Sequence, residues 1–85
     1  MSKIKVVRIE WEDSSSTLRV WHSRKDLAAM TNQKCTSIGF LVHEDDHCVI
    51  VAGHKGDDEC PDFSGDMRIP KSAIRKRKYV REDKL

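Results

Sequence analysis

The sequence has few of the residues that build a large or disulfide-bonded core. Its 85 residues include only two Trp, two Phe and one Tyr, together with three cysteines. A chain of this length buries about 60% of the surface that its unfolded form exposes, so we expect one domain with one thin core. An odd number of cysteines without a secretory signal predicts reduced thiols rather than a disulfide framework.

Long hydrophobic runs are also missing. The first residues form no apolar signal core, and no segment approaches the roughly 20 apolar residues that a membrane span needs. These absences predict a cytoplasmic protein that has no membrane partner.

The motifs of common enzymes and metal sites are absent as well. There is no Gly-rich phosphate loop, no Gly-x-Ser-x-Gly turn and no His-Glu-x-x-His helix, so we expect no enzymatic activity, no catalytic residues and no cofactor. His43, His47 and Cys60 are of types that bind zinc, but no Cys-x-x-Cys pair occurs and their spacing is not that of a zinc site. We therefore expect no bound metal.

Charge is unevenly distributed, although the formal net charge is only +2. Residues 1–41 carry a net charge of +3, residues 42–66 carry −7, and residues 71–85 carry +5. Such a dipolar chain favours association with an anionic small molecule, an acidic host protein or the acidic half of a second copy. Because the core is thin, we also expect a homo-oligomer.

Alternation with a period of two dominates the sequence and predicts β-strands. In "KIKVVRIEWE" the apolar positions change phase between Val6 and Val7, as a β-bulge would cause. The short segment "LRVW" predicts a brief second stretch of strand. The segment "SRKDLAAM" then predicts a helix of two or three turns that is capped by Ser23. Its expected inward face consists of Leu27, Ala28 and Met30.

Residues 35–54 have the pattern of a β-hairpin with an acidic tip. Its second strand is a nearly continuous apolar run at residues 48–52, as in a strand that is buried on both faces. Gly39, inside the first strand, predicts a strong bend or a close approach of two backbones. The apolar residues expected on one inward face of the first strand are Ile38, Phe40 and Val42.

The last third of the chain predicts a loop, a strand, a turn and a final strand. Residues 53–66 are rich in glycine and acidic side chains, and a strand follows at residues 67–69. Pro70 interrupts that strand, so we expect one helical turn at residues 71–73 before a last strand at residues 74–80. Four residues of this region are expected to point inward: Ile69, Ala73, Ile74 and Val80.

In their order, these elements resemble a small SH3-like or Sm-like barrel. We therefore expect a mainly β fold of five strands with one short helix, closed into a barrel. Residues 1–80 would form this single domain, and residues 81–85 would form a charged C-terminal tail.

The basic segment "IPKSAIRKRKYV" has two interpretations. Its charges fall on both faces of the last strand, as in a solvated edge strand that discourages strand addition. Alternatively, Lys71 at the turn and Arg75, Arg77 and Tyr79 on one strand face bind an anion. The two tryptophans either pack in the core or stack on a base. The candidate ligand-binding residues are therefore Lys71, Arg75, Arg77, Tyr79, Trp11 and Trp21.

Three motifs also resemble those of a group of small, uncharacterised proteins that are encoded by bacteriophages and prophages. The shared pattern is Trp-x-Asp-Ser near the start, Ser-x-Gly-Phe in the middle and Ile-Pro-Lys-Ser-x-Ile near the end, with a second tryptophan before a helix. The matching residues here are Trp11, Asp13, Ser14, Trp21, Ser37, Gly39, Phe40, Ile69, Pro70, Lys71, Ser72 and Ile74. The resemblance implies a phage-encoded accessory protein that acts in the host cytoplasm.

The leading functional hypothesis is a non-enzymatic binding protein that acts by occupancy. It would sequester a host defence component or an anionic, nucleotide-type signalling ligand. One alternative is an Sm-like nucleic-acid-binding protein whose basic strand follows the phosphates. Another is a structural or assembly protein of the phage particle.

Overall fold

The computed structural model describes residues 2–16 and 21–85 and has a mainly β fold of five strands, as predicted. The elements are β1 (Lys3–Asp13), α1 (Arg24–Ala28), β2 (Gln33–Glu44), β3 (Cys48–Lys55), β4 (Phe63–Pro70), the 3-10 turn η1 (Lys71–Ala73) and β5 (Ile74–Lys84). The brief strand predicted from "LRVW" falls almost wholly on residues 17–20, outside the described residues. Within the described ranges, no helix is long and apolar enough to cross a membrane.

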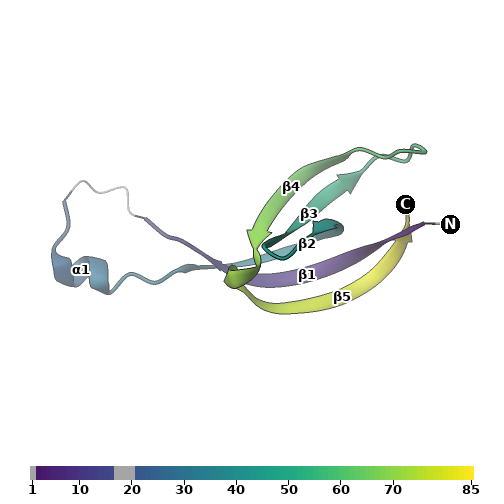
Figure 1. Cartoon of the computed structure of the whole chain (residues 1–85). Helices are drawn as coiled ribbons and strands as arrows, with labels where there is room; N and C mark the ends of the chain where they lie inside the picture. The colour runs from purple at the N-terminus through teal and green to yellow at the C-terminus, as the bar shows by residue number, and fades with distance from the viewer. Residues whose placement is uncertain (1, 17–20) are drawn as a thin grey trace.

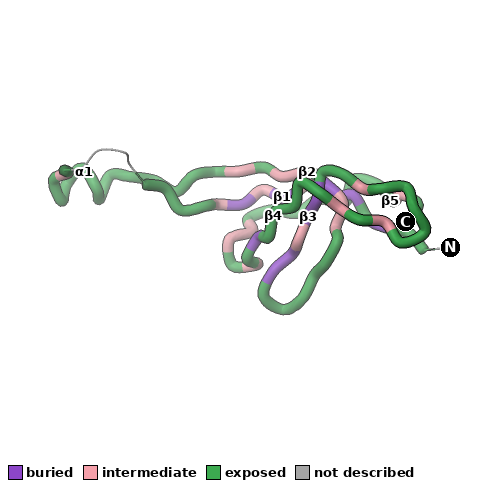
Figure 2. Tube along the Cα trace, turned by 90° about the horizontal axis from the view of Figure 1, so that it is seen from above, coloured by how far each residue is buried: buried purple, intermediate pink, exposed green. Residues whose placement is uncertain are grey.

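The five strands form one antiparallel sheet in the order β4-β3-β2-β1-β5. The sheet curls about β2 (Figure 1). The curl brings side chains of β1 into one core cluster with those of β3 and β4, which lie on the other side of β2 in the strand order. The buried residues lie in the curled part of the sheet (Figure 2). The core cluster consists of Val7, Ile9, Trp11, Val49, Val51 and Ile69.

The sheet is open rather than closed into a ring of strands. β4 and β5 are its two outer strands, and they diverge from the turn η1 that connects them (Figure 1). No strand pairing joins them within the described residues. The five-stranded architecture is thus confirmed, but the closed barrel is not.

The expected change of phase in β1 is confirmed. Ile4 and Val6 are buried, and burial then shifts to the other set of alternate positions at Val7 and Ile9. The pairing of β1 with β5 shifts register at this point, between Val6 and Val7. The extra residue at the shift belongs to β5, because Val6 pairs with Arg81 and Val7 pairs with Tyr79.

Two predictions about the C-terminal strand are wrong, and the register shift explains the first. Val80 lies between the two paired positions and is 47% exposed, so it does not point into the core. β5 also continues to Lys84, and its last residues pair with residues 3–6 of β1. Residues 81–84 therefore belong to the sheet rather than to a separate tail. The other predicted inward residues agree with the structure, since Ile69 is buried and Ala73 and Ile74 pack against the core cluster.

The predicted inward face of β2 is wrong at two of its three residues, while the third, Phe40, is half-buried. Ile38 is 60% exposed, and Val42 is also exposed, whereas Gly39 on the opposite face is buried. Gly39 pairs with Val7 of β1, which is buried, and paired residues lie on the same face of a sheet. Side chains from β1, β3 and β4 form the buried core cluster, and β2 adds the half-buried Cys35 and Leu41 to it.

Gly39 itself has the predicted role. A Cβ atom at this position would lie 2.5 Å from the backbone oxygen of Ala52 on β3. Only glycine therefore allows the two strands to approach so closely at the line about which the sheet curls.

The predicted helix is shorter than expected and has no buried residue. Ser23 caps it as predicted, since the amide of Asp26 donates to the Ser23 hydroxyl over 3.1 Å. However, α1 has five residues and none is buried, so the expected inward face of Leu27, Ala28 and Met30 is wrong.

The helix has no buried face because it lies at the end of a projecting arm (Figure 1). β1 and β2 pair with each other beyond Trp11, where the pairing of β1 with β5 has ended. We use "arm" for residues 12–16 and 21–34.

The close approach at Gly39 leads to a stability prediction. Gly39→Ala should lower the free energy of unfolding by about 1–3 kcal/mol, because the added methyl group would contact backbone atoms that cannot rotate away. Urea denaturation measures this difference. Gly53→Ala is the matched control, because no heavy atom lies within 4 Å of a Cβ atom there, and it should change stability by less than about 0.5 kcal/mol. Equal effects of the two substitutions would contradict the assigned role of Gly39.

Candidate functional site

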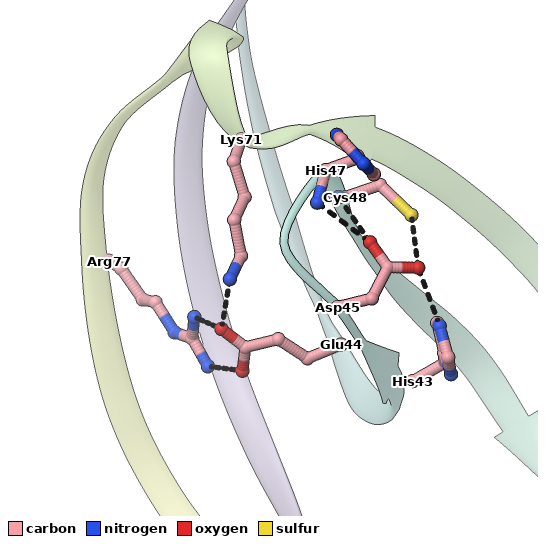
Figure 3. Close-up of polar contacts among 7 residues, drawn as sticks. All are labelled: His43, Glu44, Asp45, His47, Cys48, Lys71 and Arg77. Carbon is pink, nitrogen blue, oxygen red and sulfur yellow. Dashed lines mark hydrogen bonds and ion pairs between the residues drawn. The ribbon is translucent and has the colours of Figure 1, made fainter.

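Two of the predicted binding residues meet at one carboxylate. The guanidinium of Arg77 donates two hydrogen bonds to Glu44, with N–O distances of 2.9 and 2.8 Å. The Lys71 ammonium lies 3.1 Å from the same carboxylate (Figure 3). Because Glu44 ends β2, Lys71 begins η1 and Arg77 lies in β5, this cluster links three separate parts of the chain. A bidentate fork of this kind is the strongest common geometry for an ion pair.

The cluster changes the proton affinity of Glu44. Hydrogen bonds from Arg77 and then Lys71 lower the pKa of Glu44 from 4.5 to about 2. The same contact with Glu44 raises the pKa of Arg77. Lys71 and Arg77 thus already share an internal anion, although all three side chains are partly exposed.

A second carboxylate organises the turn between β2 and β3. Asp45 accepts hydrogen bonds from the backbone amides of His47 and Cys48, at 2.8 and 2.9 Å (Figure 3). The His43 ring lies 2.9 Å from its other oxygen. These contacts hold the pKa of Asp45 well below its usual range, and the hydrogen bond with His43 has the largest effect. The carboxylate is thus occupied as a turn cap, and no group of three or more metal-ligating side chains occurs among residues 2–16 and 21–85.

Arg75 has a different acidic partner from Arg77. It lies 3.5 Å from Glu12, and it donates to the backbone oxygen of Ser72 over 2.9 Å. A second register shift separates the pairing of Ile74 from that of Lys76. The strict alternation expected for Arg75 and Arg77 is therefore interrupted. Arg77 and Tyr79 do share a face of the sheet, because they pair with Ile9 and Val7 of β1, which are both buried.

A pocket of about 410 Å³ lies at the base of the arm, where β1, β2 and β5 meet. Trp11 forms part of its wall and is only 7% exposed, and the indole nitrogen donates to the Ser37 hydroxyl over 3.0 Å. Three cationic and two acidic side chains also line the pocket: Lys34, Arg75, Lys76, Glu10 and Glu12. The pocket thus combines an aromatic wall with a net positive lining.

The structure therefore divides the six predicted binding residues into separate places. Trp11 and Arg75 line one pocket, and Lys71 and Arg77 share Glu44. Tyr79 is 54% exposed beside Arg77 in β5. Trp21 is 89% exposed and belongs to the arm.

Two important residues were missed in the sequence. Lys34 enters the pocket because it pairs with Glu12 across the two strands of the arm. Glu44 meets Arg77 across 33 residues of sequence. No local sequence pattern indicates either contact. The excess of acidic residues before η1 and of basic residues after it is the one sequence feature that suggests ion pairs between the two regions.

Comparison with known proteins adds no relative. No family model matches this chain, and neither curated proteins nor solved structures match it.

The lowered pKa of Glu44 predicts an acid-sensitive contribution to stability. A carboxylate whose pKa is lowered in the folded state stabilises the fold above its unfolded pKa, and this contribution is lost as the pH falls through the folded value. Glu44→Gln should therefore melt below the unsubstituted protein at pH 7, and the difference should shrink between pH 4.5 and about 2. Thermal unfolding followed by circular dichroism at several pH values measures it. Asp66→Asn removes an exposed acid of β4 and serves as the control. A pH-independent difference for Glu44→Gln would contradict the ionic role of this residue.

Proposed function

We propose that this protein is a non-enzymatic binding protein that holds a compact, anionic, nucleotide-type ligand in the pocket at the base of the arm. The observation that carries the proposal is the convergence of Trp11, Lys34, Arg75 and Lys76 on one space of about 410 Å³. That volume lies in the range of small-ligand sites. The protein acts by occupancy, because a bound ligand is withheld from other partners.

The chemistry of the lining supports this ligand class. Arg75 is already oriented by Ser72 and Glu12, so its planar fork loses little freedom when it binds a phosphate. Lys34 and Lys76 add positive charge from the two neighbouring strands. Glu10 and Glu12 supply oxygen atoms that can accept hydrogen bonds from sugar hydroxyls or base amino groups.

The fold and the motifs support the wider setting of the proposal. The strand order β4-β3-β2-β1-β5 and the single turn between β4 and β5 favour an SH3-like or Sm-like barrel as the architectural class. The resemblance of the three motifs to small phage-encoded proteins favours sequestration of a host defence component or its signalling ligand in the host cytoplasm.

Nucleic-acid binding is the competing function. A protein that follows a long phosphate backbone needs a row of available cations. Lys71 and Arg77 already share the carboxylate of Glu44, so they do not extend a row of available cations from Arg75, which favours a compact ligand over a long strand.

The proposal predicts a specific effect of pocket substitutions. Isothermal titration calorimetry with mononucleotides, dinucleotides and cyclic nucleotides should identify a ligand. Lys34→Ala and Arg75→Ala should each weaken its binding about ten-fold, or about 1.4 kcal/mol. Lys78→Ala is the matched control, because it removes the same charge from β5 outside the pocket lining.

Two results would contradict the proposal. One is an equal loss of affinity in Lys78→Ala and the pocket variants. The other is binding to single-stranded oligonucleotides alone, with an affinity that falls steeply as the salt concentration rises, which is the behaviour of a phosphate-following surface.

A further inference from the structure

The end of the arm exposes apolar side chains that nothing in the described chain covers. Trp21 is 89% exposed, Leu27 is 49% exposed and Met30 is also exposed. Large apolar side chains gathered in this way are typical of interaction surfaces rather than of a free surface. Arg24 and Lys25 of α1 lie among them. We use "arm tip" for residues 21–30.

The opposite end of the molecule has complementary features. A second pocket of about 410 Å³ lies there, beside the chain ends, and is lined mainly by Ile4, Leu41, Val42, Phe63 and Leu85. The loop between β3 and β4 directly precedes Phe63 and carries Asp57, Asp58, Glu59 and Asp62. Lys55 binds Asp57 at 3.1 Å. Within the described residues, the other three acids of this loop have no ion pair.

We infer that the arm tip of one copy docks into this second pocket of another copy. Trp21 enters the apolar pocket, and Arg24 and Lys25 face the acidic loop at residues 56–62. The arm tip and the pocket lie at opposite ends of a molecule whose longest dimension is 57 Å (Figure 1). The arm tip of one chain therefore cannot reach the second pocket of the same chain.

Charge complementarity identifies a second copy as the partner. Arg24 and Lys25 outweigh Asp26 in the arm tip, and the loop that precedes Phe63 of the pocket carries four acids. The same chain thus supplies a positive apolar tip and an apolar pocket beside a negative loop. Lys3 and Lys5 also line the pocket. Glu82 lies 3.8 Å from Lys3 and offsets its charge, and the four acids of the neighbouring loop outnumber the remaining Lys5. This inference does not rest on the proposed ligand, because that pocket lies at the base of the arm and not at its tip.

Sedimentation velocity over a range of concentrations tests the inference. The unsubstituted protein should associate at low salt, and Trp21→Ala and Val42→Lys should each weaken association at least ten-fold. Two matched controls, Val80→Ala and Ile38→Lys, alter exposed apolar residues outside both surfaces and should associate normally. Circular dichroism confirms that each variant is folded. A protein that stays monomeric throughout would overturn the inference, as would control variants that lose association equally.

Mixing the two variants gives a sharper test. Trp21→Ala keeps a working pocket and Val42→Lys keeps a working tip, so the mixture should form a heterodimer although neither variant associates alone. The emission of the exposed Trp21 should shift to shorter wavelength as the heterodimer forms. Absence of a heterodimer would overturn the inference.

A charge exchange provides a test that leaves the apolar residues intact. Arg24→Glu combined with Lys25→Glu should abolish association, and adding Asp58→Lys with Glu59→Lys to the same chain should restore it. All four side chains are exposed, so the fold should tolerate these changes. Failure of the second pair to restore association would separate the tip from the acidic loop and overturn their assignment as partners.

Discussion

The close approach of Gly39 to the backbone of Ala52 is the constraint on which the curled sheet depends. β2 lies at the centre of the strand order, and the core forms only because the strands on its two sides pack against each other. A side chain at the fold line would hold β3 away from β2. The thin core of an 85-residue chain is thus built around a position that contributes no side chain of its own.

The ion cluster at Glu44 complements this backbone constraint. Curling brings the end of β2 next to η1 and β5, and Glu44 then joins them through Lys71 and Arg77. A backbone hydrogen bond of 2.8 Å from the Lys71 amide to the His47 oxygen joins the same two regions. These contacts tie the end of β2 and the turn after it to η1 and β5, and the edge strands β4 and β5 diverge from η1.

The sequence predicted those features that local physics determines. The change of phase in β1, the Ser23 cap, the turn η1 and the role of Gly39 each follow from a few neighbouring residues. The inward face of β2 could not be read in the same way, because large side chains of other strands fill the core there. The face of α1 was misjudged because amphipathic spacing implies a partner, and this helix has none in the described chain. The partners of Arg75 and Arg77 depend on register and curvature, which no local pattern encodes.

The pairing of β5 with β1 has a consequence for how the chain folds. The last strand of the sheet pairs along most of its length with the first, and the amide of Leu85 donates to the backbone oxygen of Ser2 over 3.2 Å. On a ribosome, β1 therefore cannot acquire its second neighbour until nearly the whole sheet has been synthesised. Pairings between residues so far apart in sequence are slow to form, since a long loop must first close. During translation one edge of β1 therefore stays unpaired until β5 has been synthesised. A nascent chain that stalls before residue 74 would expose that edge to chaperones or to other chains.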